Sequence, residues 1–158
     1  MKYLNIKVYS TGSSRKEWDR RYEQWMEEFA SIQDKFPKRF IKEFGKYHFH
    51  DNIINSLSIE KIKTKRNGCR YHLNMKLLDF EDERFIHDMD FFDVQEFKSN
   101  LTFDGIVGVC DWIYSEILPA GKNRFSWEIA LFGDGRSLYF DFAKMRYKKI
   151  RADKPVSK

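Results

Sequence analysis

Histidine and aspartate stand side by side in the segment Tyr47-His48-Phe49-His50-Asp51. Histidine is the side chain whose ordinary pKa lies nearest to neutral pH, and a neighbouring carboxylate makes its ring a stronger base. Imidazole and carboxylate are also ligands that transition metals accept. His48, His50 and Asp51 are therefore candidates for acid–base catalysis or for metal binding.

A structural role is the alternative for these three residues. An aspartate at a corner of the chain can cap backbone amides, and the histidine beside it is then satisfied by a hydrogen bond. We expect this structural role, with no cofactor and no metal. A metal site would need at least one further ligand, and the candidates are His72, His87, Asp88 and Asp90.

Carboxylates are concentrated in residues 79–93, where Arg84 is the one basic residue among them. The run lacks the glycine and the terminal glutamate of an EF-hand loop, so its pattern does not indicate that calcium site. It is either a solvated turn and strand face or a docking surface, because opposite charges steer protein association. The partner-binding residues that we predict are Asp79, Asp82, Asp88, Asp90 and Phe92.

Net charge is +5, but it is unevenly distributed. Residues 51–140 carry 11 basic and 15 acidic side chains, whereas residues 141–158 carry 7 basic and 2 acidic ones. A basic C-terminal segment could bind nucleic acid, yet no RNP or helix-turn-helix pattern accompanies it. We therefore expect a basic protein partner rather than nucleic acid.

Two helices are expected before the His-Asp segment. Large apolar residues recur at three- and four-residue steps and predict one helix over residues 15–35, which starts at the capping box Ser14-Arg15-Lys16-Glu17. Pro37 suits the first turn of a second, shorter helix, for which Gly45 is the expected stop. The residues expected to face the core from the long helix are Trp18, Tyr22, Trp25, Phe29 and Ile32.

From Asn52 onward the apolar period changes from helical to two, which indicates strands. Short turns between them require antiparallel pairing. We predict an α+β fold, with one long and one short N-terminal helix packed on a mostly antiparallel sheet of about five to seven strands. It forms a single domain over residues 1–150, followed by a disordered basic tail at 151–158. The expected strands lie near residues 3–9, 53–64, 69–78 (after an Asn67-Gly68 turn), 85–92, 125–132 and 138–147. Residues 112–118 are expected to form either a further strand or a short helix.

Cys69 and Cys110 are too few for a disulfide framework or a structural zinc site. The first ten residues lack the apolar region of a signal peptide, and no apolar run is long enough to span a membrane. We therefore expect a cytoplasmic protein with no membrane partner. The sequence also lacks the motifs of phosphate loops, serine hydrolases and zinc proteases.

Four short motifs stand along the chain: Phe49-His50-Asp51, Trp112-x-Tyr114-x-Glu116-Ile117, Glu128-Ile129-x-Leu131-Phe132 and Leu138-Tyr139-Phe140. Together they resemble a family of small bacterial β-rich proteins with a Phe-His-Asp box, similar to predicted immunity proteins of polymorphic toxin systems. The resemblance covers roughly residues 47–143 and implies no catalytic residues.

The function that we expect is that of a non-enzymatic protein-interaction module. The resemblance implies an immunity protein that binds and neutralises a toxin, with a basic toxin domain as its partner. One alternative is a metal-dependent or acid–base enzyme that uses His48, His50 and Asp51. A further alternative is a nucleic-acid-binding accessory protein.

Overall fold

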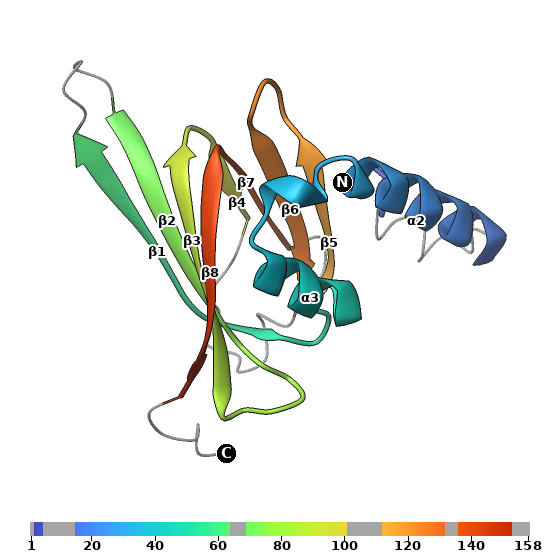
Figure 1. Ribbon diagram of the computed structural model, residues 1–158, viewed down its shortest axis with the longest axis horizontal. Coiled ribbons are helices and arrows are strands. Elements are labelled where there is room, and N and C mark those ends of the chain that lie inside the picture. The colour runs from blue at the N-terminus through green and yellow to red at the C-terminus, as the bar shows by residue number, and fades with distance from the viewer. Residues whose placement is uncertain (1, 5–14, 64–68, 101–111, 132–135, 153–158) are drawn as a thin grey trace.

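Two helices and eight strands make up the described part of the chain (Figure 1). The computed structural model describes residues 2–4, 15–63, 69–100, 112–131 and 136–152. The elements are α2 (Arg15–Ala30), a 3-10 turn (Gln33–Lys35), α3 (Lys38–Tyr47), β1 (Ile53–Lys63), β2 (Cys69–Leu78), β3 (Phe85–Val94), β4 (Phe97–Ser99), β5 (Trp112–Pro119), β6 (Phe125–Leu131), β7 (Ser137–Phe142) and β8 (Lys144–Arg151). The predicted α+β class is confirmed, with one long and one short N-terminal helix.

The strands form two four-stranded antiparallel sheets, in the orders β1-β2-β3-β8 and β4-β7-β6-β5. Two stretches of chain each contribute one strand to each sheet. In the first stretch only two residues separate β3 from β4, and in the second only Ala143 separates β7 from β8. Each stretch bends as it passes from one sheet to the other. The two sheets therefore meet at a shared corner.

The opposite edges of the two sheets also meet, at the His-Asp segment. The Asp51 amide donates to the Trp112 carbonyl at 2.8 Å, and the Trp112 amide donates to the Asn52 carbonyl at 2.9 Å. These bonds connect the start of β1 to the start of β5. The sheets thus wrap around a common interior, and Phe49 lies inside it with 2 % of its surface exposed.

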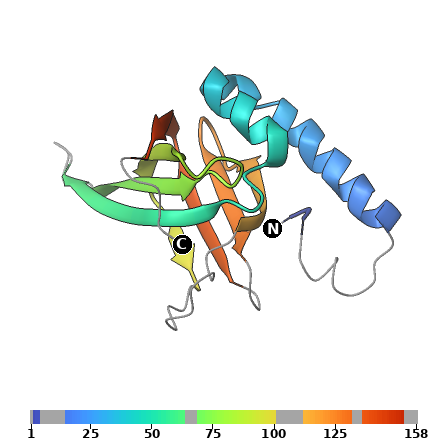
Figure 2. The same ribbon diagram turned by 90° about the horizontal axis from the view of Figure 1, so that it is seen from below.

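The two helices lie together on one side of the sheets and cover that interior (Figures 1 and 2). Trp25 of α2 and Phe40 and Phe44 of α3 are fully buried, and the Phe40 and Phe44 rings meet Trp127 of β6 edge-on. Their three- and four-residue spacing places these side chains on one face of each helix, as the sequence predicted. One aromatic core therefore joins both sheets to both helices.

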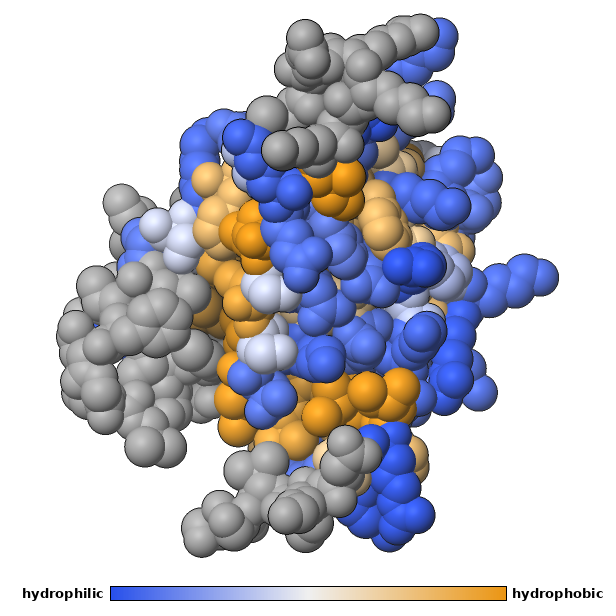
Figure 3. All heavy atoms as spheres, turned by 90° about the vertical axis from the view of Figure 1, so that its left-hand side faces the viewer, coloured by the Kyte–Doolittle hydropathy of each residue, from blue (hydrophilic) through white to orange (hydrophobic). Residues whose placement is uncertain are grey.

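The side that carries β1 and β2 has a hydrophilic band with apolar areas beside it (Figure 3). Three isoleucines of β1 are more than two-fifths exposed: Ile53, Ile59 and Ile62.

Some predicted boundaries differ from the structure. The long helix ends at Ala30 and not near residue 35, and a 3-10 turn follows before Phe36. Gly45 does not stop α3, which continues to Tyr47 and is capped by His48 in the left-handed region, with φ 51°. The predicted strand at 138–147 is two strands in different sheets, and this division helps to raise the strand number to eight.

Other predictions fall at the margins of the described chain. Arg151 ends β8 and so does not belong to a disordered tail, while residues 153–158 lie outside the described residues. So do Ser14 of the capping box, the Asn67-Gly68 turn and residues 5–9 of the first predicted strand. Residues 2–4 are not in a strand.

Candidate functional site

The His-Asp segment has an unusual backbone. His48, Phe49 and Asp51 have φ values of 51°, 58° and 66°, in the left-handed region that L side chains rarely adopt. Such residues cost about 1–3 kcal/mol each and persist only where surrounding contacts hold them. Here the contacts are the buried Phe49 ring and the hydrogen bonds to Trp112. The fold therefore holds His50 and Asp51 in one fixed position.

The structure brings two of the three predicted residues together and directs the third elsewhere. His50 Nδ1 lies 2.8 Å from Asp51 Oδ2, and both side chains are about half exposed. The His48 ring instead packs edge-on against Trp25 and Phe44. Burial lowers the pKa of His48 to about 4, so this ring is neutral at pH 7. His48 is thus part of the aromatic core.

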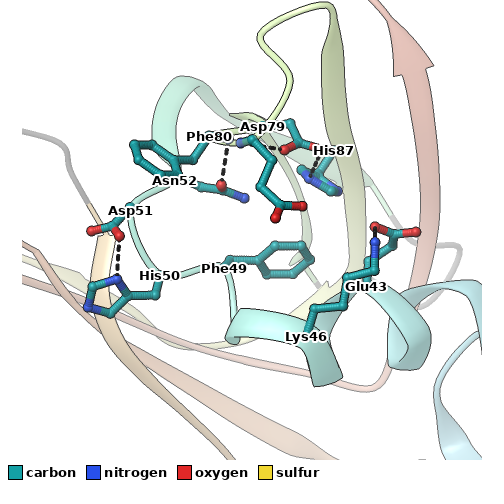
Figure 4. A pocket seen from close by; sticks show the side chains of 10 residues that line it. Glu43, Lys46, Phe49, His50, Asp51, Asn52, Asp79, Phe80 and His87 are labelled. Carbon is teal, nitrogen blue, oxygen red and sulfur yellow. Dashed lines mark hydrogen bonds and ion pairs between the residues drawn. The ribbon is translucent and has the colours of Figure 1, made fainter.

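A cavity of about 450 Å³ opens beside the His-Asp segment, between α3 and the β2–β3 loop (Figure 4). Its lining divides into inner residues, which are buried or (for Glu43) partly buried, and exposed residues. The inner residues are Glu43, Phe49, Asn52, Asp79 and His87. The exposed residues, which we call the cavity mouth, are Lys46, His50, Asp51, Phe80 and Glu81.

A chain of buried hydrogen bonds begins at the inner wall of this cavity. His87 Nε2 lies 3.2 Å from Asp79 Oδ2, and His87 Nδ1 lies 2.6 Å from the Tyr147 hydroxyl. Burial lowers the pKa of His87 to about 4, so the ring is neutral at pH 7. A carboxylate can only accept, so Nε2–H donates to Asp79 and Nδ1 accepts from Tyr147. Burial also raises the pKa of Tyr147, which keeps its hydroxyl protonated.

The chain continues to charged groups behind the cavity wall. The Lys149 ammonium pairs with Asp79 and lies 3.4 Å from Glu43 Oε2. Burial alone would raise the pKa of Asp79, but the hydrogen bond and charge of Lys149 hold that pKa below its ordinary value. The amides of Glu81 and Asp82 donate to Asp79 Oδ1 at 3.0 and 3.3 Å. Asp79 is therefore ionised, and both of its carboxylate oxygens have partners within the protein.

Because of this network, few side chains of the cavity are free to exchange a proton or a hydrogen bond with a ligand. Both ring nitrogens of His87 are bonded to protein groups, so His87 is not placed to take a proton from a substrate. His50 and Asn52 both line the cavity. The His50 ring is paired with Asp51, points away from the other lining side chains in Figure 4, and lies edge-on to Tyr114. The Asn52 side chain accepts from the Phe80 amide at 2.9 Å through Oδ1, which turns its Nδ2 group into the cavity (Figure 4).

The predicted partner-binding residues do not form one surface. Asp79 is 5 % exposed inside the cavity, and Asp82 pairs with Arg84 on the same loop. Asp88, Asp90 and Phe92 lie on the other face of β3, directed away from the core.

The outward cluster on β3 is largely compensated by its neighbours. Asp90 lies 2.9 Å from His72 Nε2 and 3.5 Å from Arg146, and the Asn74 amide donates to Asp88 at 2.8 Å. The Phe92 ring is sandwiched between His72 and Arg146. The negative charge predicted from sequence is therefore weaker on this face than its composition suggests.

Sequence reasoning did not identify the buried network around Asp79. From the sequence, His87 is predicted only as a further metal ligand and Asp79 only as a docking residue, and Lys149 and Tyr147 simply fall in the basic C-terminal segment. One signal in the sequence does bear on this network. His87 alternates with apolar residues along a predicted strand, so it shares their face of the strand. Its partners lie on β8 and α3, and the strand order that brings them close could not be read.

The candidate metal ligands remain separate. Among the described residues, no group of three or more His, Cys, Asp or Glu side chains is placed to hold a metal ion. His72 pairs with Asp90 on the outer face, and His87 pairs with Asp79 inside.

Comparison of the chain with family models, with curated proteins and with solved structures gives no match. Neither helix in the described part of the chain has the length and apolar character needed to cross a membrane.

Proposed function

We propose that this protein is a non-enzymatic interaction module that binds a basic protein, and that the partner is a toxin domain which it neutralises. The observation that carries the proposal is the cavity mouth. There Asp51, Glu81 and Phe80 line the same opening, and the Phe80 side chain is 64 % exposed. Exposed aromatic side chains next to a pocket are typical of the residues that dominate binding energy at protein interfaces.

Two further observations support binding over catalysis. The ring nitrogens of His87 are both engaged, so the buried network stabilises the cavity wall and does not present a base. The resemblance of Phe49-His50-Asp51 and the strand motifs to predicted immunity proteins points to the same class of function. Those proteins act by occupying a partner's surface.

The test is capture of the partner in the cells that encode the protein, with tagged wild type and matched variants. Phe80→Ala and Asp51→Lys should each reduce capture of a basic partner at least about tenfold, since both change the mouth without touching the core. Asp82→Asn is the control on the same loop, because Asp82 pairs with Arg84 and does not line the cavity. Asp88→Asn is the control on the outer face.

Capture that depends on neither mouth residue would contradict the proposed interface. Capture lost in Asp88→Asn alone would place it on the outer face of the sheet, where the sequence also predicted contacts. Raising salt should slow association with a basic partner, because it screens the carboxylates of the mouth.

An acid–base enzyme is the second candidate, and the His50–Asp51 pair favours it. The pair is fixed on a strained backbone at a cavity, an arrangement common at active sites. Turnover of chromogenic ester or phosphate substrates that is lost in His50→Gln and kept in His48→Gln would support this function. Stoichiometric zinc or manganese in the purified protein that is lost in His50→Ala would support the metal-dependent form.

A further inference from the structure

A second, smaller cavity of about 100 Å³ lies between α2, the His-Asp segment and β5. Its walls are mainly aromatic, because α2 contributes Trp18, Tyr22 and Trp25 and β5 contributes Tyr114. His50 is exposed and lines both this cavity and the larger one. The small cavity is therefore reached from the surface beside the cavity mouth.

Two buried polar groups belong to residues that line this small cavity. Trp25 is fully buried and Ser115 is 1 % exposed, yet within the described residues neither Trp25 Nε1 nor Ser115 Oγ has a hydrogen-bond partner. Buried polar groups in folded proteins nearly always have a partner, so two such groups at one cavity point to a ligand. The indole N–H can only donate, and the hydroxyl can also donate. One carbonyl oxygen, which has two lone pairs, would satisfy both.

The charge of the small cavity favours a neutral ligand. Its described lining contains no lysine, arginine, aspartate or glutamate. Burial lowers the pKa of His48 to about 4, so that ring carries no positive charge at pH 7, and His50 already has Asp51 as its partner. An anion would therefore enter without a cation to pair with, at a cost in free energy. An amide is neutral and planar, and its oxygen is a strong acceptor.

We infer that this small cavity binds a neutral carboxamide group. The carboxamide oxygen accepts from Trp25 Nε1 and from Ser115 Oγ, and the plane of the group packs against the aromatic walls. Since a cavity of about 150 Å³ holds benzene in another protein, a volume of about 100 Å³ suits a group of about five non-hydrogen atoms. The carboxamide comes from a small molecule or from a glutamine side chain. The inference goes beyond the proposed function, because it adds a binding site apart from the one for the basic partner.

The probe is propionamide, titrated into the full chain and followed by ¹H–¹⁵N NMR. The chain has four tryptophans and therefore four indole N–H signals. Propionamide should shift the indole signal of Trp25. The signals of Trp112 and Trp127 should stay in place, since these indole groups are also buried without a partner but do not line the cavity. Propionate has nearly the same shape with a negative charge, and it should bind at least about fivefold more weakly.

A variant on β5 tests the second donor. Ser115→Ala should weaken propionamide binding about threefold or more, and it breaks no hydrogen bond within the described residues, so the fold should survive. Ser126→Ala on β6 is the matched control, because Ser126 does not line the cavity. A Trp25 signal that propionamide does not move would overturn the inference. So would a propionamide affinity that Ser115→Ala leaves unchanged.

A peptide distinguishes the two sources of the carboxamide. The glutamine side chain of acetyl-Gly-Gln-Gly-amide is propionamide joined to a main chain, and the glutamate analogue is its charged control. Binding of the glutamine peptide with the same shift of Trp25 supports the site and assigns it to a protein side chain. Binding of propionamide without binding of the peptide supports the site and assigns it to a small molecule. Partner capture is tested through Phe80 and Asp51, which do not line this cavity, so failure of either proposal leaves the other standing.

Discussion

At the scale of single residues, burial decides which aromatic side chains stabilise the protein. Trp25 is fully buried and meets Phe29, Phe44 and the His48 ring. Its position on the buried face of α2 was predicted from spacing alone. The spacing could not show that Trp18, on the same stripe, is only partly buried and packs on Tyr114 of the edge strand β5.

Trp25→Ala should therefore lower the free energy of unfolding by about 3–5 kcal/mol, because it removes a large ring and leaves a void. Trp18→Ala is the matched control and should cost clearly less. Denaturant titration measures both. A cost below about 1 kcal/mol for Trp25→Ala would contradict the packing of α2 on the core.

Two histidines should make stability depend on pH. Burial lowers the pKa of His48 and of His87 to about 4, while the unfolded chain has the ordinary value near 6.5. The unfolded state then binds more protons between those values, so stability falls as pH drops from about 6.5 to about 4. His87, which is 3 % exposed, should account for up to about 3 kcal/mol of this loss.

Urea titrations at several pH values measure this dependence. His87→Gln removes one titrating group and should flatten the change between pH 6.5 and 4, although it also lowers stability at neutral pH by breaking the bonds to Asp79 and Tyr147. A dependence on pH that remains as steep as in the wild type would show that His87 is not buried in its neutral form.

At the scale of elements, one arginine fixes the corner where the two sheets meet. Arg124 Nη2 lies 2.5 Å from Asp141 and donates at 2.8 Å to the carbonyl of Asp93, the residue with φ 61° near the end of β3. The amides of Gln95 and Glu96 donate to the other oxygen of Asp141. The bend between β3 and β4 is thus stabilised by a residue that lies just before β6.

Arg124→Met should cost about 2–3 kcal/mol, since it removes several hydrogen bonds to charged or buried groups. Arg84→Met is the matched control, because Arg84 pairs with Asp82 in solvent and such pairs contribute about 0–1 kcal/mol. Thermal and urea unfolding distinguish the two variants. Equal costs would mean that the corner does not depend on Arg124.

The same corner explains where prediction from sequence ended. Alternation located most strands within a few residues of their bounds in the structure. The alternation shifts by one residue at Ala143, because every second residue is buried up to Phe142 and the buried positions resume at Met145. The prediction of a single strand over residues 138–147 overlooked that shift. Which sheet each half joins depends on pairing between residues far apart in the chain, such as Phe85 with Arg151. The cavity network depends on that pairing and was therefore not predictable.

At the scale of the whole molecule, opposite charges lie side by side on the outer face. Lys144, Arg146 and Lys148 alternate outward along β8, but Arg146 is opposite Asp90 and Lys148 is opposite Asp88 on β3. The basic C-terminal segment therefore does not present an uninterrupted row of cations. Nucleic-acid backbones bind to such rows, because each cation that meets a phosphate releases counterions.

The protein should accordingly show no submicromolar binding to mixed RNA and DNA in a gel-shift assay at about 0.15 M salt. The informative truncation ends the chain after Ala152, because β8 continues to Arg151 and the Ala152 amide donates to the Arg84 carbonyl. A shorter chain would lose part of the sheet and test folding instead.

The double variant Asp88→Asn with Asp90→Asn is the positive control. It removes the carboxylates opposite the cations of β8 and should raise nucleic-acid affinity with a steep salt dependence. Submicromolar binding by the wild type that disappears when residues 153–158 are removed would identify the protein as a nucleic-acid-binding accessory protein and reject the interaction module.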